Sequence, residues 1–354
     1  MMIPSDRDPR QDVRLLATSK GPLVLLFYDG FDRKAVPGYG GAVYSHAHRL
    51  ARYTYRTARR VQPWTGFYTQ FRSLAKCLGQ YGCAVKVNDF ALAMKHPAYP
   101  IGISGFPTVL DKTVELRNPR IFGPGDFGYP DSANAVANDA RNRILTLSCD
   151  WITEYYRPYC GEKVMSWPVG IDVTAWPDLS ACPKTHDVLV YDKIRWNVRA
   201  EQSRVLEPIL RRLRHQNLSY HVLRYGEHPL TEYRQKLKTS RSMIFLCEHE
   251  TQGLACQEAM ASNVPVLAWD EGVLVDPLQR RFAQPNLVVS SVPYFDDRCG
   301  ERFKSVDFEC QFDLFWQRLP GYRPREYVKE RLSMISAAKS YLAAYVSLLP
   351  HADQ

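Results

Sequence analysis

The sequence lacks the long hydrophobic runs and the paired cysteines that mark membrane-spanning and disulfide-rich proteins. No stretch reaches the ~18–20 consecutive apolar residues of a transmembrane helix, and the longest runs, such as Pro22–Tyr28, have the length of a strand. The amino end is polar and charged, without the apolar core of a secretory signal. The 9 cysteines lie singly, with no CxxC pair, and an odd number fits poorly with a full disulfide framework. We therefore expect a cytoplasmic protein with reduced, mostly buried thiols.

Patterns for a metal site or a bound dinucleotide are also scarce. The only Asp-x-Asp triplet, Asp6–Asp8, lies near the amino end, and none of the 9 histidines has a zinc-binding spacing. Gly123, Gly125 and Gly128 match the string GxGxxG, but Pro124 interrupts it and no helix is predicted to begin at the third glycine. We predict no metal and no resident cofactor.

What is present is an ordinary globular composition with a positive surplus. Hydrophobic residues make up 45% of the 354 residues and charged residues 23%, which excludes a mainly disordered or fibrous chain. Domains commonly run to roughly 100–200 residues, so the length suggests about two of them. The formal net charge of +9 favours anionic partners, but it does not choose between nucleic acid, a membrane surface and phosphorylated small molecules.

Strand-like and helix-like segments alternate in two successive series along the chain. Continuous apolar runs such as Pro22–Tyr28 and Met243–Cys247 are typical of strands buried on both faces of a parallel sheet. The predicted class is α/β, with two Rossmann-like domains facing a central cleft, the usual place for a ligand in such architectures. The predicted boundaries are a leading tail at 1–20, an N-terminal domain at 21–173, a linker at 174–186, a C-terminal domain at 187–325, and C-terminal helices at 326–354 that could cross back to the first domain.

The most informative stretch is Met243–Asp270, which combines a buried strand, an acidic loop, a glycine, a helix and a second buried strand. Glu250 follows the first strand, at the sheet edge where α/β proteins bind ligands. Gly253 begins the helix, so unpaired N–H groups and the positive end of the helix dipole form a site for phosphate there. Glu258 lies about one and a half turns into the helix, where a carboxylate can accept two hydrogen bonds from a diol such as a ribose.

This stretch resembles the donor-binding motif of retaining glycosyltransferases with the GT-B fold, the large glycosyltransferase group 1 (family 4-like) enzymes. The family pattern has two glutamates separated by seven residues, then Ala-Met-Ala and Val-Pro-Val. The chain has Glu250 and Glu258, followed by Ala259–Ala261 and Val264–Val266. A second stretch agrees, because Gly170–Asp172 matches the Gly-Ile-Asp signature that precedes the linker in the family.

The resemblance implies roles for individual residues of the second domain. Glu250 would contact the transferred sugar as a catalytic residue, and Glu258 would hold the nucleotide ribose. Backbone N–H groups near the glycine and basic residues after the domain's first strand would bind the diphosphate, and a glycine after the next strand would approach the nucleotide. The donor-binding residues implied in this way are Gly253, Leu254, Lys193, Arg195 and Gly226, with Arg199 as a third basic candidate. The family more often has Gly-Arg and a later lysine at the basic positions, so the chain departs from the pattern there.

In the first domain the resemblance leaves two alternatives for the glycine loop through which the family's chain approaches the donor phosphate and the acceptor. One is the turn that contains Gly40 and Gly41, and the other is Gly66 at the start of a helix. The family also places a polar residue, often His, at the reaction centre. Asp126 is the nearest equivalent in this sequence, and Asp89 is a weaker candidate.

The resemblance implies a retaining, metal-independent glycosyltransferase. It would move a hexose from a UDP- or GDP-sugar to a hydroxyl of a glycan, a lipid-linked glycan or a small molecule. The nucleotide sugar is a co-substrate, and we expect no nucleic-acid partner. The positive charge leaves open a peripheral contact with the inner membrane face. Two alternatives remain, a sugar-nucleotide epimerase on the same fold and a basic nucleic-acid- or membrane-binding protein without catalysis.

Overall fold

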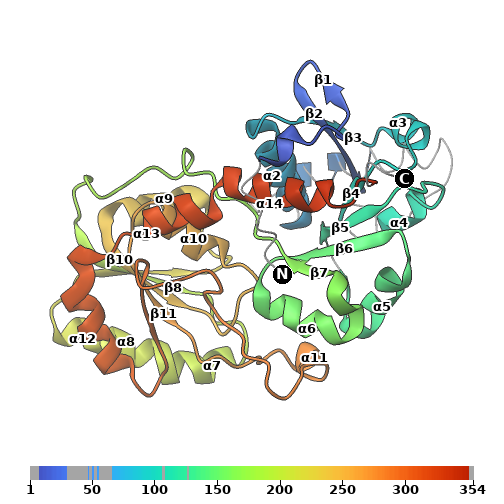
Figure 1. The fold of residues 1–354 in the computed structure, drawn as a ribbon. Coiled ribbons are helices and arrows are strands. Elements are labelled where there is room, and N and C mark those ends of the chain that lie inside the picture. Colours follow the sequence, from blue (N-terminus) through green and yellow to red (C-terminus); the bar gives the residue numbers. More distant parts are fainter. Residues whose placement is uncertain are drawn as a thin grey trace. The chain divides into compact units, whose positions relative to one another are not determined.

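The structure is a computed structural model that describes residues 8–29, 47, 50–51, 54–55, 66–105, 108–125 and 127–350. Its contacts divide the chain into two compact units (Figure 1). Met1–Gly170 and Met334–Gln354 form the first unit, and Ile171–Ser333 form the second. Each unit contains a mainly parallel sheet, so the predicted α/β class with two Rossmann-like domains is confirmed.

The described residues of the first unit form one seven-stranded sheet. The strand order is β1-β2-β4-β5-β6-β7, with β3 also paired to β2, and only β1 is antiparallel to its neighbour. The strands are β1 (Ala17–Thr18), β2 (Gly21–Asp29), β3 (Ala84–Val87), β4 (Ile101–Gly105), β5 (Arg120–Gly125), β6 (Asn142–Leu147) and β7 (Val164–Ser166). The helices are α2 (Gly66–Gln80), α3 (Phe90–Lys95), α4 (Thr108–Lys112), α5 (Pro130–Asn138), α6 (Asp150–Cys160) and α14 (Met334–Val346), with 3-10 turns at Pro9–Gln11 and Gly161–Lys163.

Strand β2 is apolar along its length because both of its faces are covered. Its consecutive residues Leu23–Phe27 are all buried. Helix α14, from the carboxyl end of the chain, packs on this unit (Figure 1). The Tyr345 hydroxyl accepts the backbone N–H of Leu25 at 3.1 Å, and the indole N–H of Trp167 donates to the Ala337 carbonyl at 2.9 Å. These bonds fix α14 to the first sheet.

The second unit contains a five-stranded parallel sheet in the order β12-β11-β10-β8-β9. Its strands are β8 (His186–Asp192), β9 (Tyr220–Arg224), β10 (Ser240–Leu246), β11 (Val266–Trp269) and β12 (Gly300–Phe303). Its helices are α7 (Val198–Glu201), α8 (Glu207–His215), α9 (Leu230–Thr239), α10 (Leu254–Ala261), α11 (Pro277–Arg280), α12 (Phe308–Arg318) and α13 (Pro324–Tyr327). Shorter helical segments are π-helical at Gln202–Leu206 and Val328–Leu332 and 3-10 at Leu319–Gly321.

Alternate residues of the central strands in this unit contribute to two apolar cores, one on each face of the sheet. Tyr191 and Phe245 belong to one core, whereas their neighbours Val190 and Ile244 belong to the other. Successive side chains of a strand point to opposite faces, so a strand buried on both faces must be apolar at every position. This accounts for the continuous apolar runs in the sequence.

The structure differs from the predicted boundary between the domains. The second unit begins at Ile171, so the predicted linker at 174–186 lies within it. Trp176 is buried in a core of the second unit, 5.9 Å from the ring of Tyr233, and its carbonyl accepts a hydrogen bond from Arg325 at 2.6 Å. The segment has no sequence period because it is held by individual side chains rather than by a regular element. The predicted C-terminal segment 326–354 also divides, with α14 joining the first unit.

The helical region after β8 is not uniform. The π-helical segment Gln202–Leu206 lies between α7 and α8 and ends two residues before Pro208, which has no N–H to continue an α-helix. Strand β12 has a weak signal in the sequence because Gly300–Phe303 is short and half polar.

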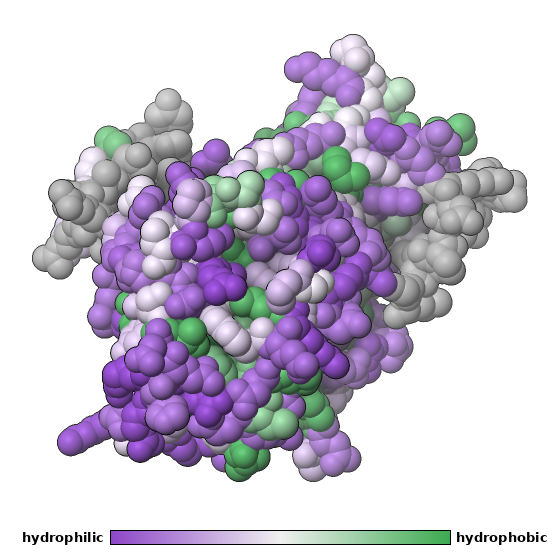
Figure 2. Space-filling model, turned by 90° about the vertical axis from the view of Figure 1, so that its left-hand side faces the viewer, coloured by the Kyte–Doolittle hydropathy of each residue, from purple (hydrophilic) through white to green (hydrophobic). Residues whose placement is uncertain are grey.

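The exposed surface is mainly polar on the side of the molecule where α12 lies. Seen from the left-hand side of Figure 1, hydrophobic residues gather only in small patches among hydrophilic ones (Figure 2). In the part of the chain that the structure describes, no helix combines the length and the apolar character needed to cross a bilayer.

Candidate active site

The strand order of the second unit gathers the candidate residues at one edge of the sheet. The first strand, β8, has the second strand β9 on one side and the third strand β10 on the other, so the order reverses between β8 and β10. Open α/β sheets bind ligands outside the carboxyl ends of the strands at such a point. The loop after β8 carries Lys193 and Arg195, and the loop after β10 carries Glu250 and Gly253. The two loops predicted to bind the donor therefore meet at this edge.

Lys193 and Glu250 contact each other directly. The Lys193 ammonium forms an ion pair with Glu250 Oε1, and the two side chains are only 13% and 8% exposed. The ammonium also lies 4.4 Å from the ring centroid of Tyr225, which follows β9. The backbone N–H of Glu250 donates to the Ser290 carbonyl at 2.9 Å. A basic residue expected to bind phosphate and an acidic residue expected to bind the sugar thus form one charged pair, shielded from water.

Arg195 is held over an aromatic stack. Its guanidinium lies 4.3 Å from the Trp196 ring centroid, and its Nη2 donates to the His249 carbonyl at 2.5 Å. The Trp196 and His249 rings stack at 4.7 Å. Burial lowers the pKa of His249 to about 4, and the nearby Arg195 charge acts in the same direction. The imidazole is therefore neutral at physiological pH and adds no positive charge to the site.

Glu248 is a residue of the candidate site that the sequence prediction missed. It is buried, and its Oε1 accepts the backbone N–H groups of Arg195 and Trp196, each at 3.0 Å. These bonds tie the loop after β8 to the loop after β10. The signal in the sequence was the acidic loop itself. That pattern does not show which glutamate would bind backbone N–H groups and which would face a ligand.

Asp192 anchors the other end of the same loop. It is 2% exposed, and Arg224 Nη1 donates to its Oδ1 at 2.6 Å, while Gln202 donates to its Oδ2 at 2.8 Å. Arg224 also donates to the Ile194 carbonyl at 2.6 Å. A loop fixed by buried charged groups at both ends presents Lys193 in a defined position.

Helix α10 begins at Gly253 with its amino end uncapped. Gly253 has a φ of 78°, a left-handed conformation that glycine adopts at little cost, and no side chain caps the helix. Leu254, the next residue, is 37% exposed. No capping side chain competes for the N–H groups of the first turn, so the predicted phosphate site at this helix start stays a prediction. Gly226, with a φ of 83°, lies in the turn after β9, directly after Tyr225.

Glu258 lies on the face of α10 that Leu254 also occupies, because the two residues are four positions apart. Burial raises the pKa of the Glu258 carboxyl to about 8, and the charge of Arg234 opposes this shift. The unliganded site therefore holds a largely protonated carboxyl near neutral pH. A ribose diol would have to supply hydrogen bonds that favour the ionised form.

A test follows from this raised pKa. The folded state binds more protons than the unfolded state between the ordinary value of 4.5 and about 8. Stability should then fall as the pH rises through this window, by up to about 1.4 kcal/mol per pH unit. In urea unfolding across the same window, Glu258→Gln should remove most of this loss, whereas Glu227→Gln, at an exposed position, should keep it. If the free energy of unfolding changed with pH in the same way for wild type and Glu258→Gln, this would contradict a buried acid at this position.

The remaining predicted residues belong to the first unit. Gly40, Gly41 and Asp126 lie outside the described residues, and Gly66 is the first residue of α2. Asp89 has a structural role, because its Oδ1 accepts the Leu92 N–H at 3.0 Å and caps α3. Arg199 lies exposed in the short helix α7 of the second unit. Among the described residues, no three or more His, Cys, Asp or Glu side chains gather in a way that could hold a metal ion.

Comparisons with known proteins show the fold. No protein-family model matches the sequence, and no curated protein matches it. The structure is similar to a glycosyltransferase from Rickettsia africae ESF-5, with a TM-score of 0.53, 10% identity, and coverage of 93% of this chain and 99% of that chain. It is also similar to sucrose-phosphate synthase from Thermosynechococcus elongatus, with a TM-score of 0.51, 12% identity, and coverage of 92% and 98%.

A weaker likeness is to TarM, with a TM-score of 0.45 and 13% identity, and the chain spans 58% of the length of TarM. The two similarities with a TM-score above 0.5 extend over nearly the whole chain, so they include both of its α/β units with their parallel sheets. The chain therefore has the GT-B glycosyltransferase fold.

Proposed function

We propose that the protein is a retaining, metal-independent glycosyltransferase that moves a hexose from a UDP- or GDP-sugar to a hydroxyl acceptor. The observation that carries the proposal is the Lys193–Glu250 pair beside the uncapped amino end of α10, at the point where the strand order reverses. Cations and helix N–H groups bind a diphosphate, and a carboxylate beside them can orient sugar hydroxyls. The acceptor is a glycan, a lipid-linked glycan or a small molecule.

Transfer requires stabilisation of the leaving group more than a strong base. As the bond from the anomeric carbon to the phosphate oxygen breaks, negative charge grows on the diphosphate. Lys193, Arg195 and the N–H groups after Gly253 would stabilise that charge without a metal ion. The acceptor oxygen attacks the same face of the sugar, and its proton passes to the departing phosphate. Retention of configuration follows from this front-face attack.

Lys193 must change partners when the donor binds. In the described structure its charge is balanced by Glu250, and a diphosphate would compete for the same ammonium. A Glu250 carboxylate released from Lys193 can then accept hydrogen bonds from the hexose. Glu258 would hold the ribose through two hydrogen bonds to its ionised carboxylate. Nucleotide binding should therefore lower the raised pKa of Glu258 and release a proton from its carboxyl group.

Thermal unfolding with nucleotide diphosphates tests the donor site. At a concentration about 100-fold above its dissociation constant, UDP or GDP should stabilise the protein by about 2.7 kcal/mol. Glu258→Ala should lose most of this stabilisation, because the ribose loses both hydrogen bonds. Glu227→Ala, at an exposed position, should keep it. Full stabilisation of Glu258→Ala would refute the ribose assignment.

Product analysis separates transfer from isomerisation. Incubation with UDP- or GDP-hexose and an acceptor should give a glycoside that keeps the anomeric configuration of the donor. An isomerised nucleotide sugar, formed without acceptor, would instead establish an epimerase. Chelators should leave the rate unchanged, and a rate abolished by chelation and restored by a divalent ion would contradict the metal-independent mechanism.

A further inference from the structure

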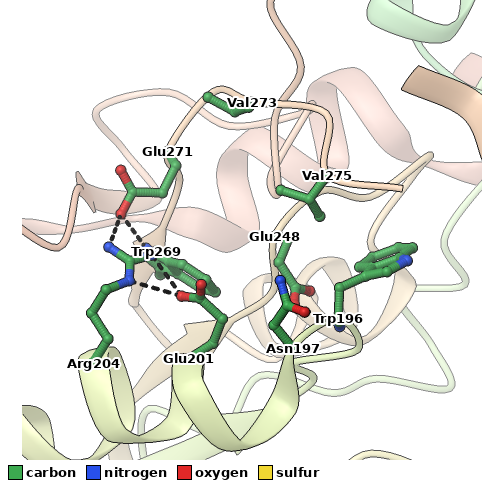
Figure 3. A pocket seen from close by; sticks show the side chains of 9 residues that line it. All are labelled: Trp196, Asn197, Glu201, Arg204, Glu248, Trp269, Glu271, Val273 and Val275. Atoms are coloured by element: carbon green, nitrogen blue, oxygen red, sulfur yellow. Dashed lines mark hydrogen bonds and ion pairs between the residues drawn. The ribbon is translucent and has the colours of Figure 1, made fainter. Parts of the chain in front are cut away.

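A hollow lies beside the candidate site, next to the contact between Glu248 and the loop after β8. About 330 Å³ of space lies within it, part of it open to solvent. Figure 3 shows its side chains, with Val273 and Val275 on one side and Asn197 and Glu201 on the other. The lining residues are Trp196, Asn197, Glu201, Arg204, Glu248, Trp269, Glu271, Val273 and Val275. The proposed donor contacts do not use this hollow, although Trp196 and Glu248 adjoin both.

The charges of the lining exclude an anionic ligand. Three glutamates face one arginine, so the lining is net negative. Arg204 is already committed, because its Nη2 binds Glu201 at 2.6 Å and its Nη1 contacts Glu271 at 3.3 Å. Burial alone would raise the pKa of Glu271, but hydrogen bonds from Ser305 and Trp269 outweigh it and lower the pKa to about 2. A phosphate or carboxylate would therefore meet uncompensated negative charge.

The aromatic residues disfavour a cationic ligand. The Trp196 ring already has the Arg195 guanidinium at 4.3 Å and stacks on His249, and the Trp269 ring has the Arg204 guanidinium at 5.6 Å. Cation recognition by aromatic residues requires a ring face that the ligand can approach. The Arg204 guanidinium takes one face of the Trp269 ring, and the Trp196 ring packs against the Arg195 guanidinium and the His249 imidazole. What the indoles and the two valines offer is apolar contact.

Hydrogen-bonding groups remain for a neutral polar ligand. The hydrogen bonds of the Glu271 carboxylate fall on Oε1 and those of the Glu201 carboxylate on Oε2, so each carboxylate has a second oxygen for a hydroxyl group. Asn197 precedes α7 but makes no capping hydrogen bond with its side chain. Its amide can both donate and accept. Acceptors, one amide and apolar walls are what a sugar ring requires, with hydroxyls at its rim and C–H groups on its faces.

We propose that this hollow binds a neutral sugar ring. The inference goes beyond the proposed function, because it concerns binding to the second unit alone and does not require transfer. The ring would be contacted by Val273 and Val275, and its hydroxyls would be bound by Glu201, Glu271 and Asn197. A ring in this place would be next to the donor loop, since Trp196 and Glu248 contribute to both sites.

Saturation-transfer NMR on the full chain without nucleotide tests the proposal. The probes are maltose, cellobiose, lactose and N-acetylglucosamine at about 20 mM, enough to fill a site with a millimolar dissociation constant. At least one should receive saturation, and Val273→Arg should weaken its binding at least about tenfold by filling the hollow. Val273 is 52% exposed, so the arginine does not disturb a core. The matched control Val13→Arg, at a 96% exposed position of the first unit, should bind normally.

A second variant tests the polar contacts. Asn197 has a φ of 45°, which glycine adopts readily, so Asn197→Gly removes the amide and preserves the backbone. It should weaken sugar binding severalfold while UDP or GDP still stabilises the protein. The proposal fails if no probe binds, if binding survives Val273→Arg, or if spermidine binds in preference to every sugar. These results leave the transferase assignment standing, because that assignment depends on nucleotide stabilisation and product analysis.

Discussion

Glu250→Gln is expected to lower kcat/KM for sugar transfer by about 10³-fold. Glutamine keeps the shape of the side chain but removes the charge that balances Lys193 and that can accept hydrogen bonds from the hexose. Loss of one preorganised polar group in an active site typically costs about 10²–10³ in rate. Here the effect should lie at the upper end, because the Glu250 side chain is only 8% exposed and its hydrogen bonds to the hexose would be shielded from water. The fall should appear in kcat more than in the donor KM, since the diphosphate and ribose contacts come from other residues.

The partner variant tests how the charge balance between Lys193 and Glu250 contributes to stability. Lys193→Met removes the other half of the pair, and the double variant Glu250→Gln/Lys193→Met leaves no buried charge unpaired. The double variant should regain the melting temperature, because neither buried charge is left unpaired. Its activity should stay low, because Lys193 is also proposed to bind the diphosphate, so the catalytic role of Glu250 is judged from Glu250→Gln alone. Glu162→Gln, whose carboxylate is 88% exposed in the first unit, is the matched surface control. Activity of Glu250→Gln within threefold of wild type would refute the catalytic assignment.

The sequence predicts the fold well where a feature depends on local pattern. Runs such as Met243–Cys247 are apolar at every position, and the structure buries β10 between two cores. Glu250, Gly253 and Glu258 fall within one strand–loop–helix unit, so their relative places follow from spacing along the chain. Once the strand and the helix are correctly identified, the loop and the helix start lie at the carboxyl edge of the sheet.

Features that depend on contacts between distant segments could not be predicted in this way. Glu248 binds the N–H groups of Arg195 and Trp196, which are more than 50 residues away, and nothing in either segment shows this contact. The same holds for Asp192 and Arg224, which meet only because β8 and β9 are neighbours. The segment after Ile171 belongs to the second unit through tertiary contacts, such as the burial of Trp176 and the bonds of Arg325 to the Val173 and Trp176 carbonyls, and the composition of the segment does not show these contacts.

The positive surplus of the chain is not explained by the donor site. Residues 171–333 contain nearly equal numbers of basic and acidic residues, so the net charge of +9 comes almost entirely from the rest of the sequence. In the second unit, Lys193 and Arg224 are each paired with a carboxylate. A surplus carried by the other part of the chain would attract an anionic acceptor or surface independently of nucleotide binding.

Glu248→Ala is expected to lower kcat/KM by about 10²-fold, mainly through a higher donor KM, and to destabilise the protein by about 2–5 kcal/mol. The carboxylate accepts two backbone N–H groups from the loop that carries Lys193 and Arg195. Each buried N–H left without a partner costs about 1–3 kcal/mol, and the freed loop no longer holds its cations where the diphosphate needs them. Urea unfolding and initial rates against donor concentration measure the two effects.

Glu248→Gln decides whether Glu248 acts through the loop. Both N–H groups reach Oε1 at 3.0 Å, and the Arg195 N–H also lies 3.2 Å from Oε2. A glutamine carbonyl oxygen in the place of Oε1 can accept the two shorter bonds. Glutamine should therefore restore most of the donor affinity, whereas a residue needed for its negative charge would not be rescued. If Glu248→Ala loses stability but keeps the donor KM of wild type, the loop does not depend on this contact, and Arg195 is positioned by its contacts with Trp196 and the His249 carbonyl. Rescue by glutamine with parallel recovery of KM and stability would show that Glu248 positions the donor loop without touching the donor.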